Sequence, residues 1–317
     1  MDRRHFLGAS IASAAFAIAR PALAAEGPKQ LRIGYQKNGV LLIAKQQKLF
    51  ETRFADLGLD VRFVEFSSGP PLLEALNSGS IDFGTTGDAP PIFAQAARAN
   101  LLYVAAQPGS GSTSAILVRD ASPIRSLSDL KGKKVGFTKA SSAHNVTIAA
   151  LEKAGLTYAD ITPVYLQPAD ASAAFTRGAI DAWTIWDPYF AIAEAQPGTR
   201  VLARGEDIVR QNSYFLANRD FTTRFPHIVS AVNDELAKAE ISTSAHRDEA
   251  ASLFAAATGI PVDIQRKIVA RSEFAISPLT DAIASEQQAV ADRFQKLGLI
   301  PDPIVVRDIV WKWTPNS

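Results

Sequence analysis

The chain of 317 residues contains no cysteine. This absence excludes disulfides, thiolate nucleophiles and zinc or iron–sulfur centres held by cysteine. Histidine is scarce as well, and no two of the four histidines lie within five residues of each other, as a metal-binding pair on one helix would require. Complete GxSxG, P-loop, HExxH and GxGxxG motifs are also absent. The sequence therefore offers little to nucleophilic, metal-dependent or nucleotide-dependent catalysis.

Charge of one sign is not in excess either. The 33 basic and 32 acidic side chains leave a net charge of +1, which provides no bulk attraction to nucleic acid or to an anionic membrane. Beyond residue 25 there is no run of roughly 18 apolar residues, the length of a membrane span. With 47% hydrophobic residues, a chain of this length is predicted to form about two globular domains.

Three elements of an export signal stand at the start of the chain. The pair Arg3-Arg4 precedes an apolar run over residues 7–18, and Ala22-Leu23-Ala24 follows. A charged segment, a short apolar run and an A-x-A site in this order are typical of a secretory signal peptide. The arginine pair with Phe6-Leu7 resembles the twin-arginine export motif. We predict that residues 1–24 are removed and that the mature protein is periplasmic.

The remaining sequence alternates short apolar runs with helical patterns that end at glycine. The first strand is predicted over residues 31–35, followed by a helix over residues 40–56. Such alternation predicts an α/β protein with mainly parallel sheets. Three long helices are expected near the C-terminus, over residues 226–244, 247–257 and 278–296.

One sequence unit occurs twice, about one hundred residues apart. The run Ile33-Gly34-Tyr35-Gln36-Lys37 matches residues 135–139, and Gly79-Ser80-Ile81-Asp82 matches residues 178–181. Six residues after the aspartate of each second run stands another aspartate, Asp88 or Asp187. These ordered matches predict two similar lobes, which we place at residues 25–114 with 216–317 and at residues 115–215. We expect the chain to cross between the lobes over residues 109–114 and again over residues 213–217, and two such crossings form a hinge.

The repeated strand-to-helix junctions predict where a ligand binds. Ligands of open α/β sheets lie beyond the carboxyl ends of the strands, so we expect a cleft lined by loops 36–39, 85–89, 139–144 and 183–189.

The residues of these loops indicate an anion site. Ser141 and Ser142 stand at a predicted helix start, where hydroxyl groups join free backbone N–H groups and the positive end of the helix dipole. Thr86 and Gly87 repeat this arrangement in the first lobe. Plain helix capping is the alternative, and our hypothesis for Asp88 is that it caps its helix.

Two tryptophans follow in the second lobe, Trp183 and Trp186. Successive strand residues face opposite sides of a sheet. We therefore expect one of them in the core and the other as an apolar wall of the cleft, which would stabilise a short alkyl chain by about 0.8 kcal/mol per methylene.

These motifs resemble those of the periplasmic substrate-binding proteins of ABC importers, in the group that binds sulfonates, taurine and nitrate. The resemblance runs from about Leu31 to the C-terminus and rests on residues 33–37, 78–93, 141–145 and 181–189. It is strongest to the aliphatic-sulfonate branch. It implies a two-lobed, type II periplasmic binding protein fold that closes on an alkanesulfonate and delivers it to a membrane permease and its ATPase for sulfur acquisition. The implied protein is a monomer without a cofactor, metal or catalytic residue.

The resemblance also assigns ligand-binding positions. In the family, the loop after the first strand, a Thr-Gly-Asp turn and a Ser-Ser helix start meet the sulfonate oxygens, and Ala143 replaces a serine that is frequent in the related pattern. Combined with the residue patterns, it leads us to expect ligand contact from twelve residues: Gln36, Lys37, Thr86, Gly87, Asp88, Ser114, Ser141, Ser142, His144, Trp183, Asp187 and Tyr214.

Several alternatives stay open from the sequence. Taurine is one, if Asp88 pairs with an ammonium group, and nitrate is another. A pyrimidine would stack on Trp183 or Tyr214. A sensing module would bind the same ligands, whereas a pyrimidine-type enzyme on this fold is disfavoured by the absence of cysteine and by the predicted export.

Overall fold

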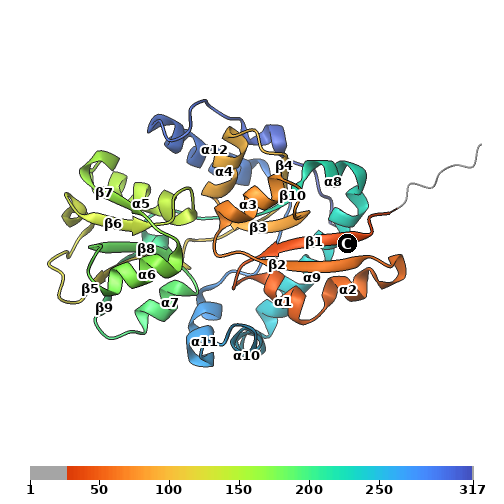
Figure 1. Cartoon of the computed structure of the whole chain (residues 1–317), viewed down its shortest axis with the longest axis horizontal. Coiled ribbons are helices and arrows are strands. Elements are labelled where there is room, and N and C mark those ends of the chain that lie inside the picture. Colours follow the sequence, from red (N-terminus) through yellow and green to blue (C-terminus); the bar gives the residue numbers. More distant parts are fainter. Residues whose placement is uncertain (1–26, 316–317) are drawn as a thin grey trace, which may run out of the picture.

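Two five-stranded sheets form the centres of two lobes that lie side by side, with helices on the faces of each sheet (Figure 1). The computed structural model describes residues 27–315. The predicted signal peptide, residues 1–24, lies outside the described residues. The architecture confirms the predicted two-lobed α/β class.

The order of the strands is the same in both sheets. The sheet of the first lobe runs β2 (Asp60–Glu65), β1 (Gln30–Tyr35), β3 (Phe83–Gly87), β10 (Ser213–Asn218), β4 (Leu101–Gln107). The sheet of the second lobe runs β7 (Thr162–Tyr165), β6 (Lys134–Phe137), β8 (Ala182–Trp186), β5 (Ser114–Arg119), β9 (Thr199–Arg204).

The helices fall into three groups along the chain. The first lobe begins with α1 (Val40–Gln46), α2 (Leu49–Arg53), α3 (Gly69–Asn77) and α4 (Ala89–Ala96). The second lobe carries α5 (Ser142–Lys153), α6 (Pro168–Thr176) and α7 (Tyr189–Glu194). The C-terminal part adds α8 (Arg219–Arg224), α9 (Pro226–Ala245), α10 (Arg247–Thr258), α11 (Val262–Arg271) and α12 (Asp281–Lys296). Short 3-10 helices are η1 (Ala55–Leu57), η2 (Leu127–Leu130), η3 (Tyr158–Asp160), η4 (Gly205–Asp207) and η5 (Val306–Ile309).

Each sheet contains one strand that arrives from the other lobe. In the first sheet, β10 is antiparallel to β3 and β4, while β1 is parallel to β2 and β3. In the second sheet, β5 is antiparallel to β8 and β9, while β6 is parallel to β7 and β8. The strands β5 and β10 each follow a segment that crosses between the lobes, residues 108–113 and 205–212. The two lobes are therefore joined by two crossings that run in opposite directions.

The second crossing lies earlier than we predicted. Residues 213–217 were expected to cross, yet they form most of β10, and Ser213 already pairs with Gly87 in the first sheet. Ser114, which we placed in the first lobe, begins β5 of the second sheet. The reason is that a continuous apolar run is suited to a strand covered on both faces, and such a strand does not form an exposed connection.

The predicted repeat is present in three dimensions. A Cβ atom at Gly34 would lie 2.5 Å from Ile81 Cδ1, and one at Gly136 would lie 2.4 Å from Ile180 Cδ1. Each isoleucine thus packs directly on the backbone of the first strand of its unit. The two glycines recur because this contact leaves no room for a side chain.

The aspartates of the repeat also play matching roles. Asp82 accepts a hydrogen bond from the backbone N–H of Arg32, and Asp181 accepts one from the backbone N–H of Lys134, both at 2.8 Å. Asp82 thus joins the turn before β3 to β1, and Asp181 joins the turn before β8 to β6. The repeat therefore reflects two similarly built units.

Helix boundaries depart from the predictions at three places. The helix expected over residues 40–56 is interrupted after Gln46, because Lys48 adopts a left-handed conformation with φ 54°. The helix expected from residue 278 starts after Thr280, whose hydroxyl accepts the N–H of Ile283. Helix α11 was not predicted at all, and it contributes to the site described below.

The C-terminal helices complete the structure around the first lobe. The core of the first lobe includes buried residues of α9, α10 and α12, whereas the second sheet has a separate core on each face. Figure 1 shows α10 and α11 at one side of the boundary between the lobes, and α4 and α12 at the other side. Within residues 27–315, no helix combines the length and the apolar character needed to cross a membrane.

Candidate functional site

A cavity of about 150 Å³ lies between the two lobes. Four strand-to-helix junctions line it, at residues 36–40, 85–87 and 90 of the first lobe and residues 141–142 and 186–188 of the second. These junctions stand at the carboxyl ends of β1, β3, β6 and β8, which is where α/β sheets bind ligands. Residues of all four predicted cleft loops thus surround a single cavity, whose size fits a small molecule.

One pair of junctions meets at Gly87 and Ser142. A Cβ atom at Gly87 would lie 1.9 Å from Ser142 Oγ, so only glycine allows this approach. Ser142 is the first residue of α5, and Ser141 stands at the N-cap position with its Oγ donating to the backbone oxygen of Thr138 at 2.7 Å. The first N–H groups of a helix have no partner inside the helix, and the positive end of the dipole lies there. This wall therefore offers neutral donors to an anion.

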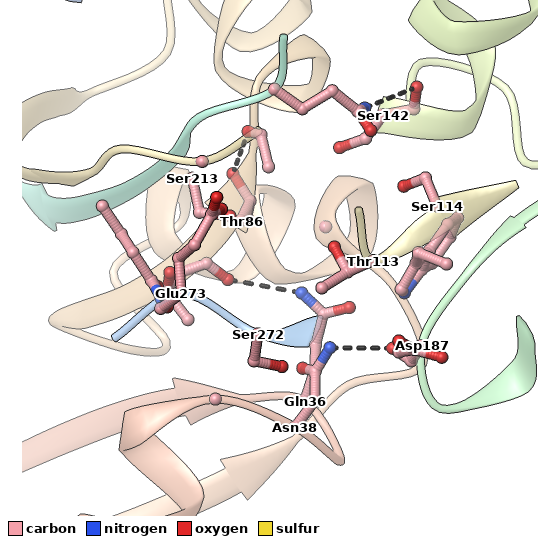
Figure 2. A pocket seen from close by; sticks show the side chains of 18 of the residues that line it. Gln36, Asn38, Thr86, Thr113, Ser114, Ser142, Asp187, Ser213, Ser272 and Glu273 are labelled. Carbon is pink, nitrogen blue, oxygen red and sulfur yellow. Dashed lines mark hydrogen bonds between the residues drawn. The ribbon is translucent and has the colours of Figure 1, made fainter. Parts of the chain in front are cut away.

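The other pair of junctions meets at Asn38 and Asp187. Asn38 Nδ2 donates to the backbone oxygen of Asp187 at 2.8 Å, across the boundary between the lobes (Figure 2). Gln36 Nε2 donates to the backbone oxygen of Thr85 at 3.3 Å, which holds the amide of Gln36 at the cavity wall. We did not single out Asn38 from the sequence, although it lies in the predicted loop 36–39.

The C-terminal helices supply a third wall that we did not predict. Its residues come from α10, α11 and the segment that follows: Phe254, Gln265, Ile268, Ser272, Glu273 and Phe274. Helix α11 had a detectable signal, because Pro261 precedes apolar residues at Ile264, Ile268 and Val269.

Eight of the twelve predicted ligand-binding residues line the cavity. They are Gln36, Lys37, Thr86, Gly87, Ser114, Ser141, Ser142 and Asp187. The other four, Asp88, His144, Trp183 and Tyr214, do not, and each has a physical reason for lying elsewhere.

Asp88 is buried behind the cavity wall. Its carboxylate accepts the backbone N–H of Ala89 at 2.7 Å, at the start of α4, and the side-chain amide of Asn145 at 2.6 Å. Burial raises the pKa of Asp88 to about 6, although hydrogen bonds from Asn145, Ala89 and Ser142 act in the opposite direction. Asp88 thus lies outside the cavity lining, unlike the predicted ligand contact, and its contact with Ala89 agrees with the capping hypothesis.

His144 belongs to an aromatic cluster. Its ring stacks on Phe137 with centroids 4.9 Å apart and contacts Phe294 at 5.1 Å, while Nε2 lies 3.0 Å from the hydroxyl of Tyr158. Burial lowers the pKa of His144 to about 3. His144 is a neutral, buried packing residue of α5 and lies outside the cavity lining, unlike the predicted ligand contact.

One tryptophan lies in the core and the other lines the cavity, as expected. However, the cavity residue is Trp186 and not Trp183, which we listed as a ligand contact. Trp183 is 1% exposed and packs on Phe175 in the core of the second lobe, whereas Trp186 lines the cavity. Tyr214 is fully buried and packs edge-on against Tyr103 with centroids 5.2 Å apart. Neither Trp183 nor Tyr214 is available to stack on a ligand.

Asp187 lines the cavity, but its carboxylate is already bound. Its two oxygens accept Arg271 Nε at 2.7 Å and Nη2 at 2.6 Å, and the N–H of Ala191 adds a bond of 3.1 Å. Burial raises the pKa of Asp187, and the Arg271 guanidinium opposes that shift. Arg271 also pairs with Glu194 at 3.1 Å. The carboxylate thus links α7 of the second lobe to α11.

Charged side chains are few around the cavity. Those among the described lining residues are Lys37, Asp187 and Glu273. Lys37 Nζ lies 3.4 Å from a carboxylate oxygen of Glu65, and Asp187 is paired with Arg271. Within the described part of the chain, no group of histidine, aspartate and glutamate side chains is arranged to hold a metal ion.

Comparison with known proteins places the chain in a family. The NMT1/THI5-like family model matches residues 41–250, about two thirds of the chain. The chain belongs to the NMT1/THI5-like family.

Two solved structures of this family's fold are similar in sequence as well. The periplasmic aliphatic sulphonate binding protein SsuA from Escherichia coli is 42% identical, with a TM-score of 0.82 over 92% of this chain and 94% of that chain. The alkanesulfonate-binding protein SsuA from Xanthomonas axonopodis pv. citri, bound to MOPS, is also 42% identical, with a TM-score of 0.86 over 90% of this chain and 99% of that chain.

The same fold occurs in an enzyme. The desulfurization enzyme DSZB is 16% identical, with a TM-score of 0.66 over 91% of this chain and 97% of that chain. At that identity the likeness concerns the fold alone. The fold therefore does not separate binding from catalysis, and the site must do so.

Proposed function

We propose that this protein is a solute-binding protein that captures aliphatic sulfonates between its lobes and delivers them to an ABC importer. The observation that carries the proposal is the wall formed by Gly87, Ser141 and Ser142, where the start of α5 meets β3 and presents neutral donors. A sulfonate is a permanent monoanion that offers acceptors and no donor, so a donor-rich wall suits it. The two solved relatives at 42% identity are named for binding sulfonates, which supports the same ligand class.

The strength of such a site is sufficient without a salt bridge. Each hydrogen bond to a charged group contributes about 1.5–3 kcal/mol, and three or four of them, less ordering costs, approach the ~8 kcal/mol of a micromolar complex. Trp186 supplies an apolar surface for the alkyl chain. Since the described part of the cavity holds neither a nucleophile–base pair nor a metal-binding group, these residues support binding better than catalysis.

Calorimetric titration of residues 25–317 with pentane-1-sulfonate tests the proposal. We expect one-to-one binding with a micromolar dissociation constant. An absence of heat from folded protein that has been freed of co-purified ligand contradicts the sulfonate assignment. Nitrate, taurine and a pyrimidine, titrated in parallel, then identify the ligand class.

We further propose that the twin-arginine signal in residues 1–24 exports the protein to the periplasm, where it acts as a monomer with the permease and ATPase of its importer. The ordered signal elements and the periplasmic E. coli relative support this location. Replacing Arg3 and Arg4 with lysine is expected to leave unprocessed precursor in the cytoplasm, as cell fractionation would show. Normal processing of that variant would contradict twin-arginine export.

A further inference from the structure

Glu273 is an unusual residue for the wall of an anion-binding cavity. It follows α11 and is partly buried, and it lines the cavity together with Ser272 and Phe274. Its Oε2 accepts the backbone N–H of Ser110, in the first crossing, at 2.7 Å. Oε1 has no hydrogen bond and no ion pair to any residue of the described range 27–315.

The other charged side chains of the cavity have partners. Asp187 is held by Arg271, and Lys37 lies beside Glu65. Among the described residues, Glu273 is therefore the charged lining residue that has no ion-pair partner. A carboxylate in this position repels a simple anion in the same cavity, because charges interact more strongly where they are partly shielded from bulk water.

The position of Glu273 separates it from the anion wall. Figure 2 shows Glu273 and Ser142 on opposite sides of the cavity. Phe274 lines the cavity beside Glu273, and its ring is covered by the Arg247 guanidinium, 5.2 Å from the ring centroid. A ligand that spans the cavity with a sulfonate at Ser142 brings its other end toward this carboxylate.

We propose that Glu273 receives a cationic amine, so that the preferred ligands are zwitterionic aminoalkanesulfonates rather than simple alkanesulfonates. The inference rests on the proposed function, since it assigns the second end of the same site. Asp88, which would have been the candidate partner for an ammonium group, is buried and bonded to Asn145. Glu273 takes that role because it lines the cavity and one of its carboxylate oxygens has no hydrogen-bond partner among the described residues.

The test compares two ligands of the same size. The probes are 3-aminopropanesulfonate and butane-1-sulfonate, which differ in a terminal ammonium or methyl group. The wild-type protein is expected to bind the amine at least tenfold more tightly in a calorimetric titration. In Glu273→Gln, the amine is expected to lose at least tenfold in affinity while butane-1-sulfonate is unchanged or gains. The glutamine keeps a carbonyl oxygen that can accept the N–H of Ser110, so the crossing remains held.

A purely structural role for Glu273 gives a different pattern. If Glu273 serves only to fasten Ser110, Glu273→Ala weakens both ligands equally and Glu273→Gln weakens neither, and that result overturns the inference. An equal affinity of the wild-type protein for the two probes overturns it as well.

Two further measurements complete the test. Should Glu273→Gln fail to fold, the wild-type protein is titrated with N-acetyl-3-aminopropanesulfonate, which lacks the positive charge. The wild-type protein must then bind this compound more weakly than 3-aminopropanesulfonate. If the wild-type protein binds neither 3-aminopropanesulfonate nor butane-1-sulfonate, the proposed function fails first, and this inference falls with it.

Discussion

Asp88 and Asp187 occupy the same position in the two halves of the repeat, but the partners of their carboxylates differ. Both are buried and both accept a backbone N–H near a helix start. Asp88 receives its further hydrogen bond from the neutral amide of Asn145, whereas Asp187 is clamped by the guanidinium of Arg271. The repeat determines where a carboxylate stands, and residues from distant segments decide how its charge is compensated.

Removing the guanidinium that pairs with Asp187 is expected to have the largest effect on the free energy of unfolding. Arg271→Met leaves a buried carboxylate without its cation, which destabilises a protein by about 3–5 kcal/mol. Arg271 also pairs with Glu194 and stacks on Phe190 at 3.8 Å from the ring centroid. Urea unfolding measures the loss.

The matched control is the double variant Arg271→Met with Asp187→Asn, which removes the charge that was left unpaired. It is expected to recover a substantial part of the lost stability. No recovery would show that the stacking on Phe190, and not the ion pair, carries the effect.

A third buried carboxyl extends the comparison to a group with no partner. Glu240, in α9, is 1% exposed, and neither of its oxygens has a hydrogen-bond partner within the described residues. Burial raises its pKa to about 8. Between the ordinary value of 4.5 and about 8, the folded state keeps a proton that the unfolded state has lost. Stability therefore falls as the pH rises through this interval and levels off above it, by a few kcal/mol in all.

The Glu240→Gln variant is expected to lose this pH dependence. Its unfolding free energy, measured by urea titration at pH 5 and pH 9, should change less than that of the wild-type protein. Because other groups titrate as well, the difference between the two proteins is the quantity to compare. Equal slopes in both would contradict a buried, unpartnered Glu240.

Neutralising each repeat aspartate in turn tests the comparison directly. Asp187→Asn strands the Arg271 guanidinium and is expected to lower stability by a few kcal/mol. Asp88→Asn has a smaller effect, about 1–2 kcal/mol, since an amide oxygen can still accept from Ala89 or Asn145. The thermal midpoint at pH 7 ranks the two variants.

Asp88→Asn carries a second readout. Because the Asp88 carboxylate lies behind the cavity wall, its neutralisation should leave the affinity ratio of taurine to alkanesulfonate unchanged. If the variant lost taurine binding and kept alkanesulfonate binding, the capping account of Asp88 would be wrong.

The smallest expected change separates the neighbouring serines at the α5 start. Ser142 faces Gly87 at the cavity wall and its side chain hydrogen-bonds to Asp88 behind that wall, whereas the hydroxyl of Ser141 donates to the backbone oxygen of Thr138. We expect a loss of at least tenfold in sulfonate affinity when both are replaced by alanine. From the structure, Ser142→Ala should account for most of that loss, ~1.4 kcal/mol, and Ser141→Ala for little. Unchanged affinity in the double variant would remove both serines from the site.

Much of the fold, and the junction loops that line the cavity, followed from local patterns. Glycine at positions 34 and 136, isoleucine at 81 and 180 and aspartate at 82 and 181 are required by contacts inside one strand-helix-strand unit, and such short-range requirements leave a spacing in the sequence. The junction loops then followed from the rule that parallel strands present their carboxyl ends together.

The errors concern contacts between segments that are far apart in the chain. Trp183 and Trp186 are equivalent in hydropathy, and only the packing of Phe175 and α6 around β8 decides which one enters the core. Asp88 was misplaced because its partner Asn145 comes from the other lobe.

The sequence by itself therefore determined the two α/β units, their strand-to-helix junctions and the serine-rich start of α5, because each depends on residues within one unit. Only the tertiary structure decided that β10 returns into the first sheet and that residues of α11 line the cavity. It also decided that Arg271 pairs with Asp187 of the second lobe and that Glu273 lines the cavity. These decisions depend on the burial of whole faces and on charge pairing across 84 residues between Asp187 and Arg271. No periodicity within a single helix or strand records such a pairing.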